Sequence, residues 1–283
     1  MTTSSGQNYL AIPGPSVVPD EVLRSMHRPA PNIYEGELIE ITESLIQDLN
    51  YVARSSGKVA MYIANGHGIW EAALSNMVSK GDYILVIATG RFAYGWAEMA
   101  KRMEIKIDIV DFGKDKALDV ETVSKKLLSQ PKNKYKAILL TQVDTSTSVK
   151  NDIKNLRKKL TEIECPSLLA VDCIASLACD RFEMDAWGVD VMVAACQKGL
   201  MVPPGMGFVF FNHRAEERQK ELKNVSLYWD WEPRVNPSRY YEYFCGTAPT
   251  HHIYGLRTAL DMIKNEEIEK TWKRHEILSQ AIW

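Results

Sequence analysis

The sequence lacks the features that mark three large classes of proteins. No apolar run approaches the roughly 20 residues that cross a bilayer, and the opening MTTSSGQNYLAIPGP lacks the basic and apolar regions of a signal peptide. Positive charge is not in excess, since 34 Lys+Arg balance 36 Asp+Glu and the net charge is -2. A chain without a strong electrostatic field has little reason to bind nucleic acid. We expect a cytoplasmic protein that binds neither membranes nor nucleic acids.

Cysteines are few and form no pattern. The five cysteines include no CxxC pair, so the sequence predicts no zinc or other metal site and no redox motif, and we expect buried free thiols. Hydrophobic residues make up 46% and charged residues 25%, which is typical of folded globular domains. A length of 283 residues suffices for one large domain or two smaller ones.

Short apolar runs alternate with segments of helical periodicity along most of the chain. Strands are expected at 59–64, 83–88, 106–110, 137–141, 167–171, 189–194 and 207–211. Helices are expected at 20–27, 37–54, 69–79, 92–103, 120–128, 153–163 and 252–283, with a long irregular connection at 229–250. This alternation predicts an α/β fold whose mostly parallel, seven-stranded sheet has helices on both faces.

Ligands of such sheets collect outside the carboxyl ends of the strands. The polar strand ends are Asn65-Gly66-His67, Asp144 to Ser148, Asp172 and Gln197-Lys198. The first of them begins a predicted helix, where free backbone N–H groups favour a phosphate. Glycine turns between a strand and a helix are common, so this turn alone does not distinguish a phosphate site from an ordinary connection.

Lys198 and Asp172 stand at the ends of two buried strands, 26 residues apart. A lysine in a cleft can form a Schiff base, and pyridoxal phosphate needs an acid that keeps its pyridine nitrogen protonated. Taken singly, Lys198 could be a solvated loop lysine and Asp172 a helix N-cap. Phe92 could stack on a cofactor ring or pack in the core. The order of these groups at successive strand ends favours the cofactor.

Four segments of the chain carry a resemblance to a known family. PGPSVVPDEVL, NGHGIWEAAL, VDCIAS and CQKGLMVPPGMGFV resemble motifs of the fold-type I, class V pyridoxal-phosphate aminotransferases. The chain is most similar to the alanine–glyoxylate, serine–pyruvate and pyridoxamine–pyruvate group, from about Pro13 to about Trp272. The resemblance implies the fold-type I large domain and pyridoxal 5'-phosphate as cofactor.

The resemblance also implies a role for each matching residue. Lys198 would be the catalytic Schiff-base lysine and proton carrier, and Asp172 the partner of the pyridine nitrogen. The residues that match the cofactor-binding positions are Asn65, Gly66, His67 and Gln197 for the phosphate, Phe92 for ring stacking, and Ser146, with Thr145 or Thr147 as alternatives, near the ring hydroxyl. Thr247 matches a residue that reaches the phosphate of a neighbouring subunit, which implies a homodimer.

Two departures from the family pattern qualify the expected organisation. Phe244 stands where the family often has a phosphate-binding tyrosine. We expect an N-terminal arm at 1–19, a large PLP-binding domain at 20–265 and, at 266–283, the start of a small domain that looks truncated and would supply the substrate-binding arginine. Without that arginine, the candidates for binding the substrate carboxylate are Arg91, Arg234 and Arg239 and the backbone of the Gly14 turn.

The resemblance implies transamination between a small amino acid, alanine or serine, and a small 2-oxo acid, glyoxylate or pyruvate. The alternatives are another class V activity, as a lyase, decarboxylase or desulfurase, and a non-catalytic binding protein on the same fold. A desulfurase needs a mobile cysteine beyond the lysine, and only Cys245 follows Lys198. That observation weakens the desulfurase alternative.

Overall fold

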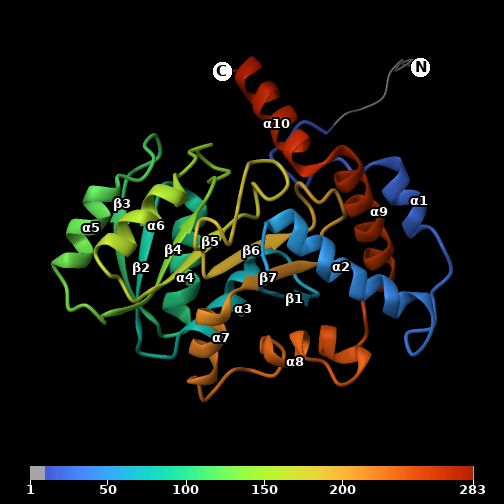
Figure 1. The fold of residues 1–283 in the computed structure, drawn as a ribbon, viewed down its shortest axis with the longest axis horizontal. Helices are drawn as coiled ribbons and strands as arrows, with labels where there is room; N and C mark the ends of the chain where they lie inside the picture. Colours follow the sequence, from blue (N-terminus) through green and yellow to red (C-terminus); the bar gives the residue numbers. More distant parts are fainter. Residues whose placement is uncertain (1–9, 283) are drawn as a thin grey trace, which may run out of the picture.

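The computed structural model describes residues 10–282, which form a seven-stranded sheet flanked by helices (Figure 1). The strands are β1 (Lys58–Tyr62), β2 (Tyr83–Ala88), β3 (Lys106–Asp111), β4 (Tyr135–Thr141), β5 (Leu168–Asp172), β6 (Val191–Ala195) and β7 (Gly207–Phe211). The helices are α1 (Asp20–Met26), α2 (Glu37–Ala53), α3 (Gly66–Met77), α4 (Arg91–Arg102), α5 (Val120–Leu128), α6 (Ile153–Glu162), α7 (His213–Lys220), α8 (Glu232–Val235), the 3-10 helix η1 (Tyr240–Phe244), α9 (Thr250–Glu266) and α10 (Ile268–Ile282).

The sheet is mostly parallel, as the sequence predicted. Its strand order is β1-β7-β6-β5-β4-β2-β3, and β7 alone among these strands runs against its neighbours β1 and β6. The carboxyl ends of the other strands therefore meet at one edge of the sheet. At this edge Asp172 pairs with Thr141 of β4 on one side and Val193 of β6 on the other.

Both faces of the sheet are buried, which explains why its strands are apolar along their length. In β2, Ile84 and Val86 join one hydrophobic cluster with residues of α3 and α4. Leu85 and Ile87 point to the other face and join a cluster with α2, α5, α6 and α9. Alternate residues of a strand face opposite sides, so a sheet covered twice needs apolar residues at every position. In Figure 1, α5 lies beside β3 at one end of the sheet, and α1 lies beside α9 at the other.

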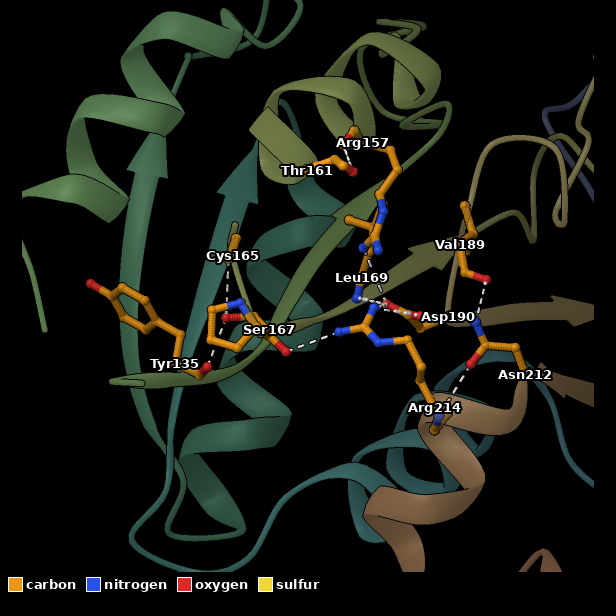
Figure 2. Close-up of polar contacts among 12 residues, drawn as sticks. Tyr135, Arg157, Thr161, Cys165, Ser167, Leu169, Val189, Asp190, Asn212 and Arg214 are labelled. Carbon is orange, nitrogen blue, oxygen red and sulfur yellow. Dashed lines mark hydrogen bonds and ion pairs between the residues drawn. The ribbon is translucent and has the colours of Figure 1, made fainter. Parts of the chain in front are cut away.

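The opposite, amino edge of the sheet is held by a buried ionic network around Asp190 (Figure 2). Asp190 is 1% exposed and accepts hydrogen bonds from Leu169 N–H at 2.8 Å and Asn212 Nδ2 at 2.8 Å. Arg214 Nη1 donates to both Asp190 oxygens at 2.9 and 2.8 Å, and Arg157 approaches at 3.4 Å. A buried carboxylate with this many donors fixes β5, α6 and α7 relative to the residue that precedes β6.

The C-terminal third differs from the sequence prediction in detail. The predicted helix at 252–283 is two helices, because Glu267, with φ of 69°, ends α9 in a conformation that cannot continue a helix. The connection at 229–250 contains α8 and η1. The periodicity did not reveal α7 because the helix buries only Ala215 and Gln219. The predicted domain boundary between 265 and 266 stays a prediction, and residues 1–9 of the predicted N-terminal arm lie outside the described residues.

The helices of the described part are all too short or too polar for a membrane. Within residues 10–282, none has the length and the apolar character needed to span a bilayer.

Candidate active site

A cavity of about 280 Å³ lies at the carboxyl edge of the sheet. Most of the predicted site residues line it together, although they come from separate strand ends: Asn65, Gly66, His67, Phe92, Asp172, Gln197 and Lys198. The rest of the lining consists of Gly14, Pro15, Trp70, Val143, Thr145, Ile174, Ala175 and Pro204. A larger hollow of about 430 Å³ lies beside Tyr135 and Arg214 and contains none of the predicted residues.

Asp172 is the last residue of β5 and forms part of the cavity floor. Its Oδ2 accepts a hydrogen bond from Trp70 Nε1 at 2.8 Å, and its Oδ1 accepts one from Ile174 N–H at 2.7 Å. Burial raises the pKa of Asp172 to about 6, and the two N–H donors oppose that rise. The carboxyl group is therefore ionised near neutral pH and can pair with a cationic ring nitrogen.

Lys198 follows β6 and reaches toward the N-terminal segment. Its Nζ donates to the carbonyl of Pro13 at 2.6 Å, and Ser16 Oγ donates back to the carbonyl of Lys198 at 3.0 Å. A Cβ at Gly14 would come within 2.3 Å of Lys198 Nζ, and Gly14 has φ of +140°, so only glycine lets the segment pass this close. Burial lowers the pKa of Lys198, against the opposing charge of Asp172. A lowered pKa favours the uncharged, nucleophilic amine.

The turn between β1 and α3 presents backbone N–H groups to the cavity. Asn65 caps α3, and its Oδ1 accepts from His67 N–H at 3.1 Å and Gly68 N–H at 3.3 Å. A Cβ at Gly66 would lie 2.5 Å from Ile174 Cδ1, so glycine lets the turn pack against the end of β5. The amides expected to hold a phosphate are thus shared with the Asn65 side chain, and an anion here would compete with its Oδ1.

Phe92 contributes an aromatic wall in the first turn of α4. Its ring stands at 71° to the ring of Trp70, with 6.1 Å between centroids, and it is only partly buried. A partly buried ring that lines a cavity fits stacking on a flat ligand better than core packing. Trp70 itself was missed by the sequence analysis, because its spacing in α3 is that of an ordinary core residue.

Two predicted residues do not line the cavity. Ser146 Oγ donates to Asp144 Oδ1 at 2.6 Å and accepts from Arg91 N–H at 2.9 Å. The adjacent Thr145, the alternative considered for this position, lines the cavity instead. Thr247 lies on an exposed turn between η1 and α9, outside the lining. Its expected role concerns a neighbouring subunit.

Arginine is absent from the residues that line this cavity within 10–282. Of the expected candidates, Arg91 and Arg239 are exposed. Arg234 is 1% exposed and donates to the backbone carbonyls of Met61 at 2.8 Å, Tyr243 at 3.2 Å and Tyr228 at 2.5 Å. These contacts make Arg234 a structural residue, which is not free to grip a substrate carboxylate.

Comparison with known proteins assigns the family. A family model described as Aminotransferase class-V matches residues 9–283. The chain belongs to the class-V aminotransferases. Serine–glyoxylate aminotransferase of Arabidopsis thaliana is 32% identical over 277 residues, 98% of this chain and 69% of that protein. Serine–glyoxylate aminotransferase of Methylorubrum extorquens is 31% identical over 288 residues, 99% of this chain and 71% of that protein.

Solved structures confirm the fold expected for a class-V aminotransferase. Alanine–glyoxylate aminotransferase from Nostoc sp. superposes with a TM-score of 0.89 at 23% identity, covering 100% of this chain and 75% of that one. Pyridoxamine–pyruvate aminotransferase from Mesorhizobium loti gives a TM-score of 0.86 at 23% identity, covering 99% and 71%. At these identities the likeness establishes the architecture, and the chemistry follows from the family and the cavity.

The cofactor of class-V aminotransferases is pyridoxal 5'-phosphate (PLP), and the cavity fits it. In the part of the chain that the structure describes, Gln197 Oε1 is buried yet has no hydrogen-bond partner. A buried polar atom left unpaired costs roughly 1–3 kcal/mol, so this amide indicates that a polar ligand completes the cavity. Asp172 suits the ring nitrogen, Lys198 the aldehyde, and the amino end of α3 the phosphate.

Proposed function

We propose that this class-V aminotransferase transfers the amino group of a small amino acid, such as alanine or serine, to a small 2-oxo acid, such as glyoxylate or pyruvate. The observation that carries the proposal is the pairing, in one cavity, of a buried carboxylate at Asp172 with an amine of lowered pKa at Lys198. The substrate class is supported by the relatives, which are named serine–glyoxylate aminotransferases.

Each of the two groups has a chemical task in this proposal. PLP, when bound, supplies an electrophilic aldehyde and a ring that accepts electron density from the reacting carbon. Lys198 Nζ would hold the aldehyde carbon of PLP, and its amine would carry a proton as general base and acid. Asp172 keeps the ring nitrogen protonated, because its buried carboxylate at the end of β5 is most stable beside a positive charge.

The remaining cavity residues bind and orient the cofactor. We assign the phosphate to the N–H groups of Gly66 and His67, with the side chains of Asn65 and Gln197 beside them. Phe92 would contact the cofactor ring by stacking, and Thr145, the neighbour of Ser146, would contact its hydroxyl group. These assignments follow the lining of the cavity and the dipole of α3.

The active unit in this proposal is a homodimer in which Thr247 reaches the phosphate of the neighbouring subunit. Thr247 is exposed, and the connection before it exposes large apolar side chains at Leu227 (77%) and Tyr241 (44%). Exposed apolar groups near a polar contact residue are typical of a protein interface. Within the same proposal, residues 20–265 form the large domain and 266–283 begin a second domain.

A reducing compartment such as the cytoplasm fits the cysteines. The five cysteines are free thiols, and two of them, Cys173 and Cys196, are buried. Disulfides are rare in the cytosol, where thiols stay reduced. We therefore propose that the enzyme works in the cytoplasm.

Borohydride trapping and a half-reaction screen test the proposed function. Reduction of the PLP-loaded protein should fix a pyridoxyl group to the peptide that contains Lys198, and Lys198→Ala should abolish it. Alanine and serine, added without an acceptor, should convert the bound cofactor to the pyridoxamine form, which has a different absorption spectrum. A pyridoxyl group on another lysine, or no spectral change with any amino acid, would refute the proposal.

A further inference from the structure

Besides Asp172, a second buried carboxylate lies beside the cavity, and no function has been assigned to it. Asp144 follows β4, in a loop closed by the bridge between Val143 and Lys150, and it is fully buried. Its Oδ2 accepts from Phe92 N–H at 2.9 Å, and its Oδ1 accepts from the N–H of Ser146 at 3.0 Å and the hydroxyl of Ser146 at 2.6 Å. Every contact is a donor to the carboxylate, which is the environment of an ionised side chain.

This carboxylate docks against the amino end of α4. A Cβ at Gly90 would lie 2.3 Å from Asp144 Cγ, so the approach requires a residue without a side chain. The N-cap residue of α4 is Gly90, which has no side chain that could cap the helix, and Asp144 supplies the capping bond to Phe92 N–H from a separate loop. The bond from Arg91 N–H to Ser146 Oγ, 2.9 Å long, fastens the same loop to the same turn.

The two segments that Asp144 joins each carry a wall of the cavity. Phe92 lies in the first turn of α4, and Thr145 follows Asp144 in the loop, and both line the cavity. We propose that Asp144 is a positioning residue that holds Phe92 and Thr145 at the spacing that the cofactor ring requires. The inference rests on the proposed function, because it takes PLP to occupy this cavity.

Asp144 also acts on Asp172 through space, which provides a second readout. Burial is the largest cause that raises the pKa of Asp172, and the charge of Asp144 raises it as well. The other groups that bear on the pKa of Asp172 are Lys198, Trp70 and Ile174, which all lower it. Loss of the Asp144 charge therefore lowers the pKa of Asp172, whereas loss of a distant helix cap leaves it unchanged.

The test compares Asp144→Asn with Asp152→Asn. Both carboxylates cap helices, since Asp152 accepts from Asn155 N–H at 2.9 Å at the start of α6, but Asp152 does not line the cavity. Asp144→Asn should weaken PLP binding by about tenfold or more, and Asp152→Asn by less than about twofold. In the cofactor-free proteins, carbon NMR should follow the titration of the Asp172 carboxyl group with pH. The midpoint of this titration should fall in Asp144→Asn and keep its wild-type value in Asp152→Asn.

The proposal is overturned if Asp144→Asn binds PLP as tightly as wild type, or loses no more affinity than Asp152→Asn. If Asp144→Asn does not fold, Ser146→Ala carries the same test, because it removes one donor to Asp144 and one bond to α4. PLP binding weakened by about threefold or more in Ser146→Ala supports the proposal, and unchanged binding overturns it. Failure of the wild-type protein to link PLP to Lys198 is a distinguishable result, since it overturns the proposed function itself.

Discussion

Removal of Arg234 tests whether one internal cation fastens the connection between α7 and α9 to the sheet. The guanidinium is directed at three backbone carbonyls, on Met61 at the end of β1, on Tyr228 and on Tyr243. It also stacks over the ring of Tyr62, 4.1 Å from the centroid. The turn from Asn65 to His67, which we propose to bind the phosphate, comes shortly after the end of β1, so Arg234 supports this turn without lining the cavity.

The expected magnitude follows from these contacts. Arg234→Met keeps the apolar stem and removes every donor. A buried carbonyl without its donor costs about 1–3 kcal/mol, and relief from burying a cation offsets part of the total. Burial already lowers the pKa of Arg234, which shows that the protein bears a desolvation cost for this charge. We expect the free energy of unfolding to fall by about 3 kcal/mol.

Urea unfolding followed by tryptophan fluorescence measures this change. The matched control is Arg102→Met, the same substitution in an exposed pair with Glu98, which should cost less than about 0.5 kcal/mol. The loss of unfolding free energy in Arg234→Lys should lie between those of the two other variants, because lysine keeps the charge but carries all its donors on one nitrogen. A loss below about 1 kcal/mol in Arg234→Met would show that the carbonyls find other partners, and the reasoning would be wrong.

Two further predictions concern the ionisable pair. The charge of Asp172 raises the pKa of Lys198 against the larger effect of burial, so Asp172→Asn should lower that pKa further. The midpoint of the pH dependence of the rate at which Lys198 reacts with PLP should then fall, and an unchanged or higher midpoint contradicts the assignment. Trp70 Nε1–H holds down the pKa of Asp172, so Trp70→Phe should raise it above about 6. Wild-type PLP affinity should weaken as the pH falls through about 6, where Asp172 takes up a proton. In Trp70→Phe the weakening should begin at higher pH, and coincident profiles of the PLP dissociation constant would refute this reasoning.

The sheet and most of the residues that line the cavity were predictable because they rest on local patterns. The runs that became β2 and β7 are apolar and end in turns, and Asp172 and Lys198 are polar residues at the ends of such runs. The polar surface helix α7 gives no comparable signal. The bond from Trp70 to Asp172 joins residues 102 apart, and no sequence period indicates it. Whether Thr145 or Ser146 lines the cavity depends on how one short loop turns, and in that loop Ser146 donates to the Asp144 carboxylate.

The network around Asp190 and the cavity lie at opposite edges of the sheet, so the residues that stabilise the fold there are not those that line the cavity. The arginines, amide and carboxylate of this network hold the amino edge, while the cofactor cavity lies at the carboxyl edge. Substitutions at the cavity residues that lie in loops, such as Thr145 and Pro204, would therefore leave the Asp190 network intact. Libraries restricted to the carboxyl edge should retain a larger folded fraction than libraries of equal size that include Asp190 or Arg214. The fold thus provides a stable platform on which the specificity of the catalyst can be varied.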